Sequence, residues 1–252
     1  MTPRYYFDAG NTRLKLWACD GAGEVIAESV IPHHGSLGAA MEALPEAFLQ
    51  SPSVVLGATV LADDTVAGFN EACLIKWGVQ PRYAVALREQ CGITNAYEEG
   101  YGRLGIDRWL AILGCDLNGL ASDDVACIVD CGTAITIDLL RGDGRHEGGY
   151  IVPGLGMMQQ SLQLHTARVR HNPLIGAGLS PGKSTAEAVM HGVMLAVTGL
   201  IEKVARDQSC KKIVMTGGDA AKTGQLLAVE YCEEPRLLLK GLQRYFADAG
   251  IS

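Results

Sequence analysis

The sequence predicts an α/β protein built from two duplicated lobes, each of which opens with a β-hairpin. Three observations lead to this prediction. The chain has 252 residues, more than the roughly 100–200 that one domain usually takes. Predicted strands and helices alternate in both halves. A short Asp-x-Gly-[Asn/Thr] turn between two predicted strands occurs at residues 8–11 and again at 130–133. A polar seam at 117–124 therefore divides an expected N-terminal lobe, residues 1–117, from a C-terminal lobe, residues 118–252.

The N-terminal half alternates short strands with helices. Apolar Leu14 and Leu16 flank polar Lys15, and this alternation predicts a strand that pairs with the apolar run at 5–7. The nearly continuous apolar run at 53–60 is typical of a buried strand. Further strands are expected at 25–31 and 83–87, and helical spacing of apolar residues predicts helices at 37–49, 64–77 and 106–117.

The C-terminal half repeats this pattern. An apolar run at 126–129, a turn at 130–133 and an alternating run at 134–140 predict a second hairpin. A helical stretch is expected from about 155 to 170. A long helix is predicted at 186–207, with Ser184 or Thr185 as its N-cap and Glu187 in its first turn, and a last strand at 212–215.

Composition excludes several classes of function. The chain has 28 acidic and 21 basic residues and a net charge of −7, and no basic run longer than Lys211-Lys212. Neither nucleic acid nor an anionic membrane is therefore an expected partner. The eight cysteines form no CxxC pair and no zinc-ligand spacing with the six histidines, which indicates buried thiols in a reducing compartment. The first residues lack an apolar signal core, and the apolar runs at 54–62 and 192–201 are about half a membrane span, so a soluble cytoplasmic protein is expected.

The glycines and acids of the repeated turn suggest a site for phosphate. The chain has 31 glycines, where average usage of ~7 % would give about 18. In the first turn, the amides of Gly10, Asn11 and Thr12 can point at phosphate oxygens, and Asp8 can hold the accompanying Mg²⁺ through water. A single Asp-x-Gly-Asn is also ordinary turn chemistry. Two strand-flanked copies favour the functional interpretation, although the chain contains no P-loop.

Six segments together resemble type III pantothenate kinase, a family of the actin/Hsp70/sugar-kinase superfamily. They are DAGNTRLK at 8–15, LGIDRW at 104–109, DCGTAIT at 130–136, GGYIVPG at 148–154, STAEA at 184–188 and TGGDA at 216–220. Each is modest alone, but their shared order and spacing are specific. The resemblance implies two actin/ribonuclease H-like lobes, each a mixed β-sheet flanked by helices, with a nucleotide cleft between them.

The resemblance also implies which residues bind ATP and cations. Asp130 would bind the monovalent cation, K⁺ or NH₄⁺, that the family needs, and Asp8 would lie near Mg²⁺, directly or through water. The implied ATP contacts are Asp8, Ala9, Gly10, Asn11, Thr12, Arg13, Leu14, Lys15, Thr133, Gly217 and Gly218.

The implied pantothenate contacts are Tyr97, Gly105, Ile106, Asp107, Arg108 and Thr185, with Asp107 as the proton acceptor. Arg108 is expected in the first turn of a helix, where a cation opposes the helix dipole, and this placement favours a ligand. The alternatives are a favourable first-turn acid for Asp107 and a solvated side chain for Arg108. The interval from Tyr97 to Gly105 is one residue longer than in the family, which leaves Tyr101 as a rival.

The activity implied by the resemblance is ATP-dependent phosphorylation of the 4′-hydroxyl of pantothenate, the first step of coenzyme A synthesis. The family further implies a homodimer. Two alternatives remain at this point. One is a kinase of the same superfamily acting on a sugar or another carboxylate. The other is an accessory factor for transcription without kinase activity, which the acidic charge does not favour.

Overall fold

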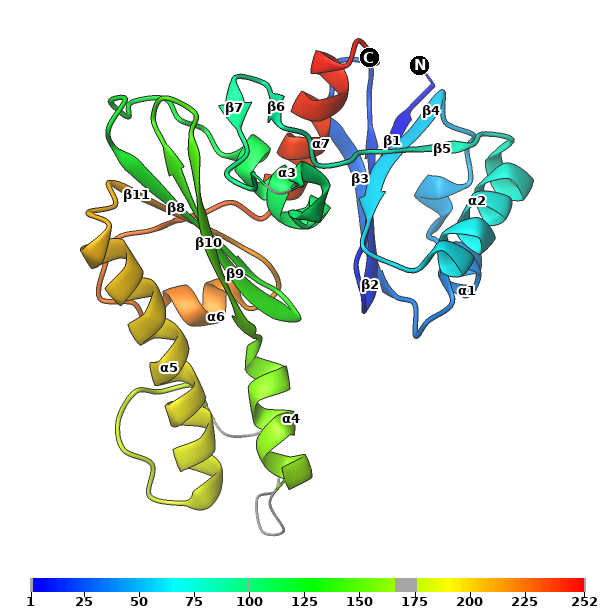
Figure 1. The fold of residues 1–252 in the computed structure, drawn as a ribbon. Helices are drawn as coiled ribbons and strands as arrows, with labels where there is room; N and C mark the ends of the chain where they lie inside the picture. Colours follow the sequence, from blue (N-terminus) through cyan, green and yellow to red (C-terminus); the bar gives the residue numbers. More distant parts are fainter. Residues whose placement is uncertain (1, 99, 166–175, 252) are drawn as a thin grey trace. The chain divides into compact units, whose positions relative to one another are not determined.

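The computed structural model describes residues 2–98, 100–165 and 176–251 (Figure 1). The chain divides into two compact units, residues 1–115 with 237–252, and residues 116–236. Each unit is built around one five-stranded mixed sheet. A two-stranded ribbon of β6 (Glu89–Gln90) and β7 (Ile93–Thr94) also belongs to the first unit.

The first sheet begins with the predicted hairpin. Strand β1 pairs antiparallel with β2 and parallel with β4, and β3 and β5 form the edges, giving the order β3-β2-β1-β4-β5. The strands are β1 (Arg4–Ala9), β2 (Arg13–Cys19), β3 (Val25–Pro32), β4 (Val54–Thr59) and β5 (Pro81–Tyr83).

Alternation along β1 gives this sheet two different faces. Tyr5, Phe7 and Ala9 point into a core formed with helices α1 (Leu37–Glu42) and α2 (Asp63–Trp77). Helices α3 (Ile106–Gly114) and α7 (Leu237–Asp248) pack on each other and contact β1 or β4 from the opposite side (Figure 1). Asp8, between Phe7 and Ala9, therefore points to the face that α3 covers.

The second sheet repeats the order and strand directions of the first. Strand β8 pairs antiparallel with β9 and parallel with β11, giving β10-β9-β8-β11-β12. This agreement confirms the predicted duplication. The elements of this unit are β8 (Val125–Cys131), β9 (Ala134–Arg141), β10 (His146–Pro153), α4 (Leu155–His165), α5 (Thr185–Asp207), β11 (Lys212–Thr216), α6 (Ala220–Gly224) and β12 (Cys232–Glu233).

Helix α5 supplies much of the core of the second unit. Met194, Val197 and Ile201 are fully buried against residues of β8 and β9. Within the described residues, α5 is the one helix long and apolar enough to cross a membrane by length and composition. Because its apolar stripe belongs to the core of the second unit, we assign α5 as a core helix.

The expected C-terminal lobe of residues 118–252 includes α7, but in the structure α7 belongs to the first unit. The reason is close packing between α7 and α3 at two glycines. A Cβ on Gly241 would overlap the Leu110 carbonyl, and one on Gly114 would overlap the Leu237 carbonyl. Two helix backbones can approach this closely only where side chains are absent.

Three element boundaries also differ from the prediction. Helix α1 ends at Glu42 instead of 49, because Pro45 prevents its continuation, and a separate 3₁₀ turn, η1, follows at Glu46–Phe48. The strand expected at 83–87 lies at Pro81–Tyr83, and α3 ends at Gly114 instead of 117. The helix expected to reach 170 is present from Leu155 to His165, and its last five expected positions lie outside the described residues.

Candidate functional site

The first Asp-x-Gly turn carries an ion pair on the α3 face of the first sheet. Asp8 and Lys15 are opposite each other in the β1–β2 register, and Lys15 Nζ lies 3.2 Å from Asp8 Oδ2. Burial raises the pKa of Asp8 above its usual value, and the charge of Asp107 raises it further, whereas Lys15 opposes the shift. Asp8 is therefore a buried carboxylate held near two other charged groups, an arrangement typical of functional sites.

Only part of the segment at 8–15 can offer side chains to a ligand. Ala9 and Leu14 are fully buried in the first core, so their contribution to a ligand is limited to the backbone. Asn11, Thr12 and Arg13 are exposed. The Gly10 amide, which was expected to point at phosphate, instead donates to the Arg13 carbonyl at 3.1 Å and closes the turn.

The second charged group of the first unit lies at the start of α3. Asp107 is in the first turn, where its Oδ1 accepts a hydrogen bond from the Arg108 amide at 2.8 Å. A Cβ on Gly105 would lie 2.6 Å from this Oδ1, so the glycine leaves space for the carboxylate. Asp107 is half-buried and lies close enough to Asp8 to affect its pKa.

Arg108 is buried, contrary to the alternative of a solvated side chain. It is only 4 % exposed, and its Nη1 donates to the Tyr97 hydroxyl at 2.9 Å. Its guanidinium carbon lies 5.7 Å from the centre of the Tyr97 ring. A buried guanidinium beside a tyrosine is suited to a planar carboxylate.

The two candidate tyrosines have different neighbours. Tyr97 contacts Arg108, whereas the Tyr101 ring lies against Arg88 at 5.8 Å. Asn95 contacts the backbone of both, because its side chain donates to the Tyr101 carbonyl at 3.2 Å and accepts from the Tyr97 amide at 3.0 Å. The geometry thus associates Tyr97, rather than Tyr101, with the Asp107-Arg108 pair.

The second Asp-x-Gly turn lies at the same place in the second sheet. Asp130 is opposite Thr216 in the β8–β11 register, next to Gly217. Gly217 has a φ of +95°, and a Cβ there would lie 2.6 Å from the Cys131 carbonyl and closer still to Asp130 Oδ1. Thr133 is exposed, and its carbonyl accepts from the Gly154 amide at 2.9 Å. The turn is therefore packed between two glycines, and Gly218 is exposed beside it.

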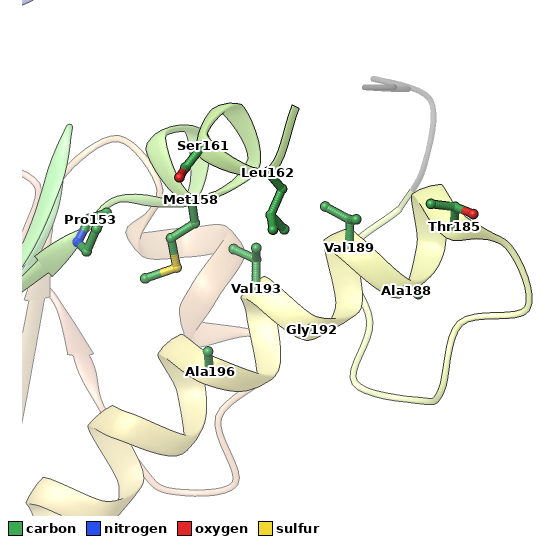
Figure 2. Close-up of a pocket in the computed structure, with 10 residues that line it drawn as sticks. All are labelled: Pro153, Met158, Ser161, Leu162, Thr185, Ala188, Val189, Gly192, Val193 and Ala196. Carbon is green, nitrogen blue, oxygen red and sulfur yellow. The ribbon is translucent and has the colours of Figure 1, made fainter. Parts of the chain in front are cut away.

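Thr185 lies elsewhere in the second unit, at the start of α5. Ser184 is the N-cap, as expected, and accepts from the Glu187 amide at 3.2 Å. Thr185 is at one end of a largely apolar groove of about 570 Å³ between α4 and α5, which Figure 2 shows with Leu162, Val189 and Val193 along it.

The predicted site residues that the structure brings together form two groups, one in each unit. In the first unit it brings together Asp8, Lys15, Asp107, Arg108 and Tyr97, with Gly105 and the half-buried Ile106 at the helix start. In the second unit Asp130 and Gly217 are neighbours at the second turn. One contact of the first turn was not predicted: the buried His33 ring lies 2.8 Å from the Gly10 carbonyl.

The donor atoms of both turns suit hard cations. Among the described residues no cluster of three or more His, Cys, Asp or Glu side chains could hold a metal ion. Each turn instead offers one Asp carboxylate, and in the second turn the carbonyl of the next residue, Cys131, lies beside the Asp130 carboxylate at Gly217. Such oxygen donors are the ligands of K⁺ and Mg²⁺ rather than of zinc or copper.

Comparisons with known proteins identify the family. A family model described as type III pantothenate kinase matches residues 5–207. A type III pantothenate kinase from Idiomarina loihiensis is 34% identical over 256 residues, covering 94% of this chain and 95% of the relative. The chain belongs to the type III pantothenate kinase family. Another type III pantothenate kinase, from Halorhodospira halophila, is 37% identical over 198 residues, 76% of each chain.

Solved structures show that the fold of this type III pantothenate kinase family member is shared more widely. A Campylobacter jejuni protein classed in the Baf family of transcriptional activators has a TM-score of 0.63, with 18% identity and 98% of each chain covered. The activator of a 2-hydroxyisocaproyl-CoA dehydratase from Clostridium difficile, with bound ADPNP, has a TM-score of 0.50 at 12% identity, covering 98% of this chain and 94% of its own. At these identities the likeness concerns the fold alone. It agrees with the predicted class of mixed sheets flanked by helices.

Proposed function

We propose that this chain is a pantothenate kinase, which transfers the γ-phosphoryl group of ATP to the 4′-hydroxyl of pantothenate in the first step of coenzyme A biosynthesis. The observation that carries the proposal is the pairing of two sites on one face of the first sheet. One is the Asp8–Lys15 turn, which suits phosphate, and the other is the Asp107-Arg108 pair, which suits a hydroxyl acid. Membership of the family supports the same acceptor.

Binding of ATP is assigned to the turns. The backbone of residues 8–15 would contact the phosphates, with Lys15 as a cation beside them. Lys15 is about one-third exposed, so it can leave Asp8 and reach a phosphate oxygen. Thr133, Gly217 and Gly218 would contact the rest of the nucleotide. The glycines permit the nucleotide to approach the backbone.

Asp107 is assigned as the proton acceptor. Phosphoryl transfer passes through a loose transition state, so the carboxylate has only to orient the attacking hydroxyl and finally accept its proton. The hydrogen bond from the Arg108 amide fixes Asp107 Oδ1 at the helix start. Arg108 and Tyr97 would bind the carboxylate of pantothenate, and Gly105 and Ile106 would line its site.

Two cations are part of the proposal. Asp8 would hold Mg²⁺, directly or through water, and Asp130 would hold K⁺ or NH₄⁺. Bound there, these ions would neutralise part of the phosphate charge. The Asp130 carboxylate and the neighbouring Cys131 carbonyl would give the monovalent cation two of its oxygen ligands.

We also propose that the chain forms a homodimer in the cytoplasm. Thr185 is far in sequence from Asp107 and belongs to the other unit. A substrate site shared between two copies of the chain would let both residues contact one pantothenate. Sedimentation of the purified protein at several concentrations measures the oligomeric state directly.

Turnover in a coupled ADP assay tests the activity. With ATP, Mg²⁺, K⁺ and pantothenate we expect steady ADP formation, and omission of K⁺ should reduce it. Asp107→Asn should lower kcat by about 10²–10⁴, the usual contribution of a proton-transfer group. Unchanged turnover in this variant would contradict the assigned role.

Asp64→Asn is the matched control for Asp107→Asn. Asp64, like Asp107, is the second residue of its helix and a first-turn acid, but it is exposed on α2. Both substitutions remove one charge that favours the helix dipole, so they should cost similar helix stability. Only Asp107→Asn should lower the turnover number.

The role of an accessory factor in transcription is not favoured. The relatives that match nearly the whole chain are named as kinases. The structural likeness to a Baf family protein is at 18% identity and concerns the fold.

A further inference from the structure

His33 is only 3 % exposed, and its side chain makes two hydrogen bonds. Its Nδ1 accepts from the Gly35 amide at 3.1 Å, and its Nε2 lies 2.8 Å from the Gly10 carbonyl. An amide can only donate and a carbonyl can only accept, so both bonds require the neutral ring with its proton on Nε2. The surroundings of His33 therefore select one tautomer.

The backbone of His33 holds the same turn at a second point. His33 follows β3, whose last residue, Pro32, is opposite Arg13 in the register with β2. The His33 amide donates to the Thr12 carbonyl at 3.3 Å. One residue thus binds two carbonyls of the first Asp-x-Gly turn, those of Gly10 and Thr12.

Binding these carbonyls also fixes the direction of two amides. In a trans peptide the C=O of one residue and the N–H of the next point in opposite directions. Because the Gly10 carbonyl points at the His33 ring, the Asn11 N–H points away from His33. The Thr12 carbonyl points at the His33 amide, so the Arg13 N–H also points away from His33. A phosphate at the turn needs N–H groups directed at it and carbonyls directed away.

We propose that His33 is a positioning residue for the nucleotide phosphates, which holds the carbonyls of the first Asp-x-Gly turn away from the phosphate and so presents its amides. This inference rests on the proposed function, since it takes residues 8–15 as the phosphate site. His33 does not touch the reacting atoms and moves no proton. Its effect is confined to the nucleotide side of the reaction.

Two amide substitutions separate the two side-chain bonds. An Asn side chain places its Oδ1 where Nδ1 lies, so His33→Asn keeps an acceptor for the Gly35 amide and loses the Gly10 bond. A Gln side chain places its Nε2 where the histidine Nε2 lies, so His33→Gln keeps a donor for Gly10. The control is His34→Asn, since His34 is exposed and has a φ of +44°, which Asn tolerates well.

The primary measurement is the dissociation constant of ATP with Mg²⁺, determined by titration calorimetry without pantothenate. His33→Asn should weaken ATP about tenfold, the effect of leaving one buried carbonyl without its donor. His33→Gln should stay within about threefold of the unchanged chain, and His34→Asn should not differ from it. Equal affinity of His33→Asn and the unchanged chain, or no rescue by Gln, would overturn the inference.

Steady-state kinetics supply the second measurement. The KM for ATP should rise in His33→Asn while the KM for pantothenate stays unchanged. A loss of general structure would raise both, so equal changes would contradict a positioning role. If the unchanged chain binds ATP but does not turn over pantothenate, the proposed function fails and the calorimetric comparison still decides the role of His33.

Discussion

Substitution of Gly217 by alanine should distort the second Asp-x-Gly turn and lower the free energy of unfolding. The added Cβ would lie 2.6 Å from the Cys131 carbonyl and closer to Asp130 Oδ1. The carboxylate can rotate away, but the carbonyl belongs to the backbone and cannot. The φ of +95° adds about 1–2 kcal/mol for a residue with a Cβ, and the overlap adds about 1–3 kcal/mol.

The expected loss in the free energy of unfolding is therefore about 3 kcal/mol, or roughly 6–12 °C in Tm for a chain of this size. Calorimetric melting of Gly217→Ala measures it. The displaced Asp130 should also raise the K⁺ concentration needed for half-maximal turnover in the coupled ADP assay. A melting temperature and K⁺ dependence equal to those of the unchanged chain would refute the reasoning.

Gly199→Ala is the matched control in the same unit. Gly199 is an exposed residue in the interior of α5, and a Cβ there would meet nothing within 4 Å. Alanine should stabilise the helix by about 0.5–1 kcal/mol. The two Gly→Ala substitutions should thus have effects of opposite sign, and only Gly217→Ala should change the K⁺ dependence.

Two further substitutions test charged groups of the first unit. Arg108→Lys should raise the KM for pantothenate about tenfold with little change in the KM for ATP. An ammonium group cannot make the two parallel hydrogen bonds that a guanidinium makes to a carboxylate. Equal rises in both KM values would contradict the assignment. Asp8→Asn should abolish turnover but raise the free energy of unfolding at pH 7. Burial raises the pKa of Asp8, and the ionised form therefore costs stability in the folded state. This cost begins as the pH rises above the unfolded value near 4, so in chemical denaturation the gain should disappear as the pH falls toward 4. A gain that persists at pH 4 would show a cause other than charge.

Much of the fold could be predicted because the sequence pattern is local. The alternation around Leu14 and Leu16, and its copy at 134–140, each lie within a few residues of their turn, and both hairpins formed as expected. The position of α7 could not be predicted, because it depends on contacts between Gly241 and Leu110, far apart in the chain. Each of the two helices carries its own apolar stripe, but a stripe does not indicate which other helix it packs against.

The candidate site could likewise be predicted only where it depends on residues close together in the sequence. The first-turn position of Asp107 follows from the local helix pattern. The contact of Arg108 with Tyr97 does not, because it depends on a tyrosine that Asn95 holds through its backbone amide. His33 was missed because a lone histidine after a strand has no signal in the sequence. Only the pairing of β2 with β3 places it beside the Gly10 turn.

Identification of the phosphorylated product tests the central claim most directly. The chain is incubated with ATP labelled in its γ-phosphoryl group, Mg²⁺ and K⁺, with pantothenate or, in parallel, with sugars and other hydroxy acids as acceptors. We predict that label appears in 4′-phosphopantothenate, identified by mass spectrometry, in the pantothenate reaction and not in the others. Label on a sugar, or ADP formation without any labelled pantothenate, would contradict it.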